Sequence, residues 1–201
     1  MPATDKIDLF KSLKTEYASP RQPRLINTSP GRYLSLTGSA VPGSEAYGAH
    51  VADLYAVAYT MKFRAKLHGG LDYAVGKLEC IWLSLPDARD ATTGWRWQLL
   101  MRVPDAIGED DLATTIDALI DKKKPESVRD VQLVALHEGR CVQMLHVGPY
   151  DREPETFALM AEFAAAEGLS TAGGHHEIYL SDPRRVEPDR LKTILRLPVT
   201  S

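Results

Sequence analysis

The stretch HHEIYLSDPRR, residues 175–185, has the composition of a strand that ends in a charged turn, and the first half of the chain contains a similar one. In KLECIWLSLPDAR, residues 77–89, a glutamate is again followed by an aromatic residue, Leu-Ser and a proline. The glutamates are Glu177 and Glu79, and one additional residue separates Glu79 from its aromatic partner. This shared order indicates that the chain arose by duplication.

The segments around these two stretches extend the match. In order, RYLSLTG (32–38), the helical pattern 44–70 and WQLLMRVP (97–104) correspond to CVQMLHVG (141–148), the helical pattern 153–168 and ILRLPV (194–199). Each half therefore reads as strand–helix–strand–strand. We predict an α+β fold in which two such tandem modules form a pseudo-two-fold antiparallel sheet, with helices on one face and a central ligand cleft. Residues 131–139 and 140–148 are expected to pair as a hairpin.

The domain boundaries follow from these elements. Residues 1–23 are predicted to be an N-terminal arm with one short helix, and residues 24–199 a single domain. Module one covers about 24–106 and module two about 128–199. A helix at about 108–124, with acids at its start and lysines at its end as the helix dipole favours, connects them.

Composition excludes several classes of function. The 201 residues include 24 basic and 27 acidic side chains, a net charge of -3, so no overall field favours nucleic acid or an anionic membrane. The N-terminus lacks the apolar core of a secretory signal, and no segment is apolar enough to span a bilayer. We therefore expect a cytoplasmic protein without direct nucleic-acid or membrane partners. Cys80 and Cys141 are expected to be small buried hydrophobes.

The alternation of the strand at residues 175–181 assigns its side chains to two faces. Ile178 and Leu180 are expected to lie against the helices. Glu177 and Tyr179 would then point outward, or toward a cleft between the two halves.

Tryptophans suggest what such a cleft contains. Trp95 and Trp97 share a face of their predicted strand, and Trp82 is close in sequence to Glu79. Exposed sheets seldom present large apolar side chains to water without a ligand or partner. One hypothesis is an aromatic cleft with Glu177 as its buried charge. The alternative is that the tryptophans belong to the core and Glu177 is solvated, and spacing alone leaves both open.

Motifs for other chemistry are absent from the sequence. Only His175 and Glu177 could share a metal on one strand face, and there is no HExxH spacing, so neither a metal nor another cofactor is expected. His146 is expected to be structural. The sequence has no P-loop, no GxGxxG after a strand, no GxSxG and no helix-turn-helix pattern.

HVGPYDREPETF and GGHHEIYLSDPRRVEPDRLKTILRLPV, supported upstream by LYAVAYTMKF, KLECIWL and GWRWQLLMRVPD, closely resemble the GyrI-like small-molecule-binding family. The resemblance covers about residues 20–199 and is to the stand-alone branch, which is related to effector domains of bacterial multidrug regulators. It implies two tandem modules around a cleft. It also implies that a glutamate, here Glu177, lies in an aromatic pocket for bulky, often cationic, organic molecules.

The same resemblance implies a reaction, since some stand-alone members hydrolyse the cyclopropane of DNA-alkylating natural products and so protect the cell. Glu177 and a pocket tyrosine would serve that reaction, with Tyr179 as first candidate and Tyr150 as second. Five further aromatic residues are candidate ligand-binding walls: Tyr33, Tyr55, Trp82, Trp95 and Trp97. Two alternatives stay open, a drug sensor or sequestering protein without catalysis and a protein inhibitor resembling the family's gyrase-binding namesake. No feature indicates a protein partner.

Overall fold

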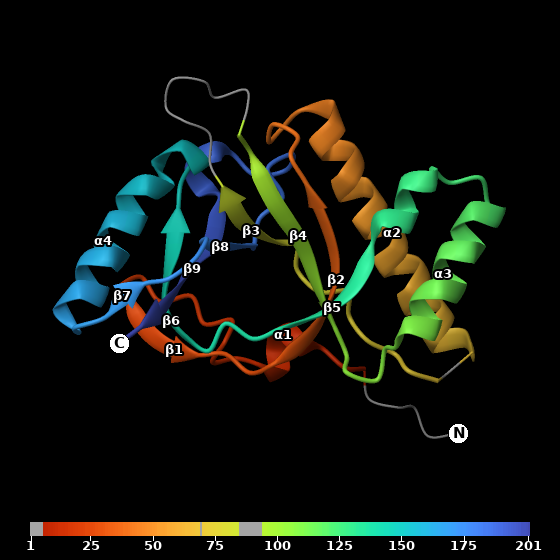
Figure 1. Ribbon diagram of the computed structural model, residues 1–201, viewed down its shortest axis with the longest axis horizontal. Coiled ribbons are helices and arrows are strands. Elements are labelled where there is room, and N and C mark those ends of the chain that lie inside the picture. Colours follow the sequence, from red (N-terminus) through yellow and green to blue (C-terminus); the bar gives the residue numbers. More distant parts are fainter. Residues whose placement is uncertain (1–5, 69, 85–93) are drawn as a thin grey trace.

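The computed structural model describes residues 6–68, 70–84 and 94–201 (Figure 1). The helices of this part are α1 (Leu9–Ser12), α2 (Glu45–His68), α3 (Glu109–Asp121) and α4 (Glu153–Ala166), with short 3₁₀ turns at Glu126–Asp130, Tyr150–Arg152 and Pro188–Arg190. The strands are β1 (Arg24–Asn27), β2 (Gly31–Gly38), β3 (Glu79–Ser84), β4 (Arg96–Val103), β5 (Gln132–Leu136), β6 (Arg140–Val147), β7 (Ser170–Thr171), β8 (His176–Tyr179) and β9 (Lys192–Thr200).

The described strands form one antiparallel sheet in the order β1-β6-β9-β8-β3-β4-β2-β5, with β7 paired to β9. The sequence β2-α2-β3-β4 in the first half is repeated as β6-α4-β8-β9 in the second. The two halves meet where β3 pairs with β8 in the middle of the sheet. The predicted α+β fold with two strand–helix–strand–strand modules is confirmed.

The two outer strands are exchanged between the halves. β1 pairs with β6 of the second half, and β5 pairs with β2 of the first half. The hairpin predicted for residues 131–148 is therefore wrong, because β5 lies at one edge of the sheet beside β2, whereas β6 lies near the other edge between β1 and β9. The segment between β1 and β2 and the segment between β5 and β6 both cross from one half to the other. These two segments are in contact, since the Thr28 N–H donates to the Gly139 carbonyl at 2.8 Å. The sheet consequently curls, bringing its two ends together.

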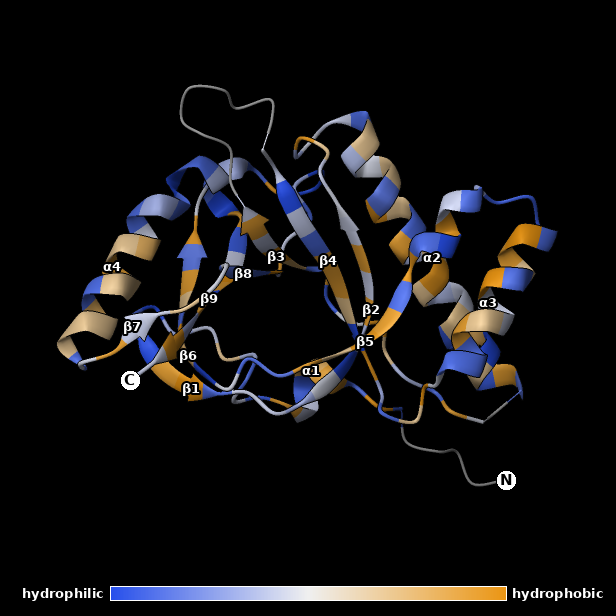
Figure 2. Cartoon of the chain, viewed as in Figure 1, coloured by the Kyte–Doolittle hydropathy of each residue, from blue (hydrophilic) through white to orange (hydrophobic). Residues whose placement is uncertain are grey.

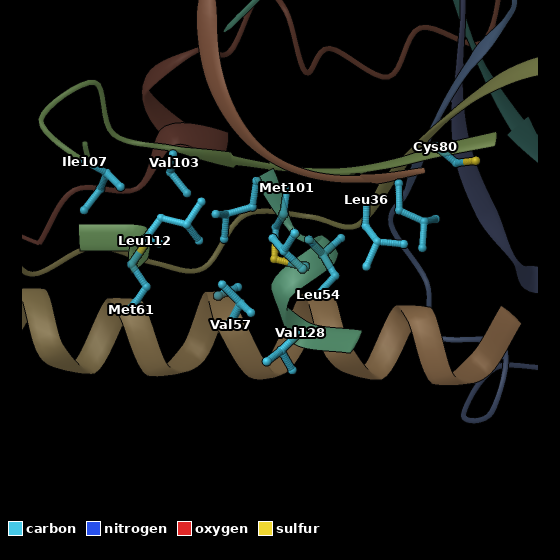
Figure 3. Close-up of a cluster of buried hydrophobic side chains, with 14 of the residues drawn as sticks. Leu36, Leu54, Val57, Met61, Cys80, Met101, Val103, Ile107, Leu112 and Val128 are labelled. Carbon is cyan, nitrogen blue, oxygen red and sulfur yellow. The ribbon is translucent and has the colours of Figure 1, made fainter. Parts of the chain in front are cut away.

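One face of the sheet, here called the helix face, carries α2 and α4 on its two sides (Figure 1). Figure 3 shows Leu54, Val57 and Met61 of α2 pointing to Leu36 and Met101 of the strands. Met160 and Ala164 of α4 pack on Val142 and Leu195 in the second half. α3 packs against α2 through Leu112 and Leu119, and hydrophilic and hydrophobic residues alternate along it (Figure 2).

Directly paired residues of neighbouring strands point to the same face. One such row crosses the sheet on the helix face through Leu36, Leu99, Cys80, Glu177, Leu195 and Met144. Glu177 is the charged residue in this apolar row. The row also corrects the repeat alignment, because Cys80 and not Glu79 is the partner of Glu177. A slip of one residue moves a strand side chain to the other face.

The expected placement of Ile178 against the helices was wrong. Glu177 and Tyr179 lie on the helix face, and Ile178 lies on the opposite face, here called the reverse face, where it packs with Tyr17 and Ile194. The reason is that α2 and α4 cover the outer strands and leave the helix side of β3 and β8 open. The N-terminal arm covers the reverse face instead.

His176 is the centre of a buried ion-pair cluster on the reverse face. Its ring nitrogens lie 3.0 Å from carboxylate oxygens of Glu79 and Glu138, and Arg196 donates to the same Glu138 oxygen at 2.6 Å. Burial alone would lower the pKa of His176, but the two carboxylates raise it to about 9. Burial opposes ionisation of Glu138, yet His176 and Arg196 hold its pKa at about 2. These ion pairs hold β8 in place on the reverse face of the sheet.

The N-terminal arm completes this cluster. The Tyr17 hydroxyl donates to Glu79 at 2.9 Å, and Arg196 donates to the Glu16 carbonyl at 2.7 Å. The Glu16 carboxylate pairs with Arg102 at 2.7 Å. Three anionic and three cationic side chains thus balance on the reverse face, and the arm is attached to β3 and β9, the two strands that flank the one carrying Glu177. None of the helices in the described ranges combines the length and apolarity needed to cross a bilayer.

Candidate functional site

A cavity of about 1080 Å³ opens on the helix face between α2 and α4. Its floor is the centre of the sheet, where β8 contributes Glu177 and Tyr179 and β3 contributes Trp82. α2 forms one wall and the first turns of α4 form the opposite one. The curled sheet and the separation of the two helices therefore create the cleft.

Six of the eight side chains predicted as site residues line this cavity: Glu177, Tyr179, Tyr150, Tyr55, Trp82 and Trp95. Tyr33 does not, because it alternates with Leu34 and Leu36 and faces the reverse side, with its ring 5.6 Å from the Arg102 guanidinium. Trp97 lies on the helix face but is fully buried beneath Tyr47, and its indole N–H donates to the Ala40 carbonyl at 2.8 Å.

Glu177 is only 4% exposed and has two close partners on its own strand. The Tyr179 hydroxyl donates to Oε2 at 2.7 Å. The ring Nε2 of His175 lies 3.0 Å from Oε1. These contacts come from the same side of one strand, because residues 175, 177 and 179 are spaced by two. The carboxylate is therefore held in one orientation at the cleft floor.

Glu153 is a second carboxyl in the cleft, and the sequence did not reveal it. It is the first residue of α4, lies on the cavity wall and is almost fully buried. Burial and the neighbouring Glu177 raise the pKa of Glu153 to about 10. Pro154 signals the helix start, but an acid there is normally a solvated partner of the helix dipole. Only the docking of α4 over the sheet buries Glu153 beside Glu177 and so raises its pKa.

His175 lies beside Glu177, on the strand face to which period-two alternation assigned both residues, but the sequence did not indicate its aromatic neighbours. Its ring centroid lies 4.4 Å from that of Phe157 and 6.3 Å from that of Trp82. Within the described ranges, no group of three or more His, Cys, Asp or Glu side chains is arranged to hold a metal ion. The observed partner of His175 is the Glu177 carboxylate.

Aromatic rings also line the cavity. Trp82 and Trp95 meet edge to face at 5.2 Å, and Tyr150 meets Tyr179 in the same way at 5.9 Å. Burial, reinforced by nearby carboxylates, raises the pKa of Tyr150 to about 12 and that of Tyr179 further still. Both phenols are therefore protonated donors at neutral pH.

Comparison with protein families now places this architecture. A model of the GyrI-like small molecule binding domain matches residues 21–200. The chain belongs to the GyrI-like family. Its function is thus, at the least, that of a small-molecule binding domain.

Solved structures of similar fold include two from Listeria innocua. One, described as a hydrolase, is 39% identical, covers 98% of this GyrI-like chain and 100% of its own, and superposes with a TM-score of 0.90. The other, an uncharacterized conserved protein, is 40% identical over 97% of this chain and 100% of its own, also with a TM-score of 0.90. The C-terminal domain of EcmrR, at 13% identity, a TM-score of 0.56 and coverage of 90% and 98%, shares the fold alone. No curated protein matches.

The buried acids and bases of this GyrI-like domain predict how its stability depends on pH. Glu153 has a folded pKa of about 10 against an ordinary 4.5, so its contribution is complete below pH 4.5 and is lost as pH rises toward 10. His176, at about 9 against 6.5, contributes fully below pH 6.5 and loses this contribution as pH rises through 9. We expect the free energy of unfolding to fall above pH 4.5 and more steeply above 6.5.

Urea unfolding at intervals between pH 5 and 9 measures both slopes. The Glu153→Gln variant should be flat between pH 5 and 6.5, and the His176→Gln variant should lose the additional slope above 6.5. A wild-type free energy of unfolding that stays constant over the whole range would contradict the assignment.

Proposed function

We propose that this GyrI-like protein binds bulky aromatic or cationic molecules in its cleft and hydrolyses cyclopropanoid DNA-alkylating compounds, which would protect the cell. The observation that carries the proposal is Glu177, an almost buried carboxylate with two fixed partners at the floor of a large aromatic cavity. The 39% identical protein from Listeria innocua described as a hydrolase supports the catalytic part.

Binding follows from the composition of the cleft. Indole and phenol faces stack on planar molecules and attract cations, each contact contributing roughly 0.5–2 kcal/mol. The net negative charge of the carboxyl pair adds attraction for a cation, because Glu153 is protonated while Glu177 provides the charge. A volume of about 1080 Å³ accepts a ligand larger than a single ring.

The proposed hydrolysis uses Glu177 as general base. A water beside the carboxylate attacks a cyclopropane carbon and gives up its proton to Glu177. The electron pair of the broken carbon–carbon bond moves into the conjugated dienone, and the negative charge develops on the distant carbonyl oxygen. That oxygen then takes a proton, so the product is the substrate plus one water. The strain of the three-membered ring favours the opening.

The tyrosines divide the remaining tasks. Tyr179 already donates to Glu177, so it orients the base. Tyr150 is the more exposed of the pair, and its hydroxyl is protonated and lines the cavity, which suits it to donate to the developing oxyanion or to the water.

Incubation of the purified protein with a cyclopropanoid alkylator tests the proposal. We expect mass spectrometry to show a product heavier by one water, formed faster than in buffer at the same pH. No rate above buffer would contradict hydrolysis. Saturable binding without turnover, measured by tryptophan fluorescence, would instead indicate sequestration of the compound.

A further inference from the structure

The cavity is elongated along α2. Tyr47, Val51, Tyr55 and Tyr59 all line it, one residue in every four. Twelve residues of α-helix span about 18 Å, so the cavity follows the helix for roughly this distance. Tyr47 adjoins Tyr179 and Glu177, whereas Tyr55 adjoins Asp182 and Arg184 in the turn after β8. Glu177 therefore lies toward the Tyr47 end of the cavity, and Asp182 with its partner Arg184 lies toward the other end.

The Tyr59 end has an aromatic surface of its own, here called the outer platform and formed by Tyr55 and Tyr59. The two rings are stacked, with centroids 6.1 Å apart and planes inclined by 23°. Tyr59 is 50% exposed although it lines the cavity, so part of its ring is open to a guest. Arg184, held by Asp182 through two hydrogen bonds of 2.9 Å, lines the cavity at the same end.

A separate aromatic surface, here called the inner platform, is formed by Trp82 and Trp95 with His175 beside them. His175 contacts Glu177 directly, so this platform adjoins the acids. Trp82 is paired with Trp97, whose ring centroid lies 5.2 Å from that of Tyr47. The inner platform thus lies toward the Tyr47 end of α2 and the outer platform toward the Tyr59 end. The two aromatic surfaces are therefore independent places for a ring to stack.

We infer that the outer platform is a second aromatic subsite and that the ligand is an elongated molecule with two separate planar ring systems. This rests on the proposed function of the cleft. One ring system lies on Trp82 and Trp95 with its polar or reacting centre at Glu177, and the other stacks on Tyr59. The linker between them runs past Val51 along α2.

A matched pair of cations measures the contribution of the second ring. The first is a bis-quinolinium whose two rings are joined by ten methylenes, and the second is a mono-quinolinium that keeps the decyl chain. Isothermal titration calorimetry should show the bis compound binding at least tenfold more tightly. Tyr59→Ala should remove most of this advantage and change the affinity of the mono compound by less than twofold, while Tyr59→Phe, which keeps the ring, should preserve it.

Phe63 provides the control. It is the next residue on the same row of α2 and is 51% exposed, but it does not line the cavity. Phe63→Ala should leave both affinities unchanged. Equal affinity of the two compounds for the wild type, or an advantage that survives Tyr59→Ala, would overturn the second subsite while leaving the proposed binding intact. Failure of both compounds to bind would contradict both proposals.

Discussion

Replacing Glu177 with glutamine should lower the rate of cyclopropane opening by about 10²–10⁴-fold at neutral pH, the usual range for loss of a general base. Glutamine has the size of glutamate and can still pair with Tyr179 and His175, so the fold and the cavity should persist. The amide cannot take the proton of water, however. Single-turnover kinetics with saturating protein separate this loss from a change in binding.

Two further carboxyl variants make the result specific. Glu153 is uncharged at neutral pH because its pKa is about 10, and an amide preserves that state. Glu153→Gln should therefore lose at least tenfold less rate than Glu177→Gln. Glu155 lies on the same helix but is exposed and paired with Arg152, so Glu155→Gln should have no effect. Equal losses in all three variants, or full activity of Glu177→Gln, would remove Glu177 from the chemistry.

Replacing Arg196 with methionine should reduce the free energy of unfolding by about 3–5 kcal/mol, the usual effect of removing one partner of a buried ion pair. Arg196 is 2% exposed and donates to Gln143, Glu138 and the Glu16 carbonyl at 2.6–2.8 Å. Methionine fills much of its volume but removes one donor from each of these buried acceptors, so that Glu138 keeps His176 as a partner and the Glu16 carbonyl keeps the Gln143 amide. It also leaves His176 as the remaining cation between two carboxylates.

Arg129 is the matched control for this variant. It pairs with Glu126 at 2.7 Å, a distance similar to that between Arg196 and Glu138, but on the exposed surface. Arg129→Met should leave the urea midpoint unchanged, because water compensates an exposed pair that is broken. Similar midpoints for the two variants would show that the reverse-face cluster does not stabilise the fold.

The fold was largely predictable because its signals are local and repeated. Alternation and helical periodicity identified both strand–helix–strand–strand units, and the match of KLECIWLSL to HHEIYLSD indicated that they form one pattern. The pairing of strands at the edges of the sheet, in contrast, involves residues far apart in the sequence. The exchange of β1 and β5 depends on free edges far along the chain, so a hairpin was predicted where the strands part.

The site was predictable only in part, for the same reason. Alternation grouped His175, Glu177 and Tyr179 on one face, but it could not say which face the helices cover. That depends on the N-terminal arm, which occupies the reverse face through Glu16 and Tyr17. The burial of Glu153 depends on where α4 packs against the sheet. The residue spacing within α4 does not indicate this position.

The exchanged border strands have a mechanical consequence. The edge strand of each half comes from the other half of the chain. Backbone hydrogen bonds therefore join the two halves at both edges of the sheet. This pairing resists a hinge motion between the two halves. The distance between α2 and α4 is therefore set before a ligand binds. We expect the cavity to accommodate different ligands through rotation of its aromatic side chains and not through movement of the two halves.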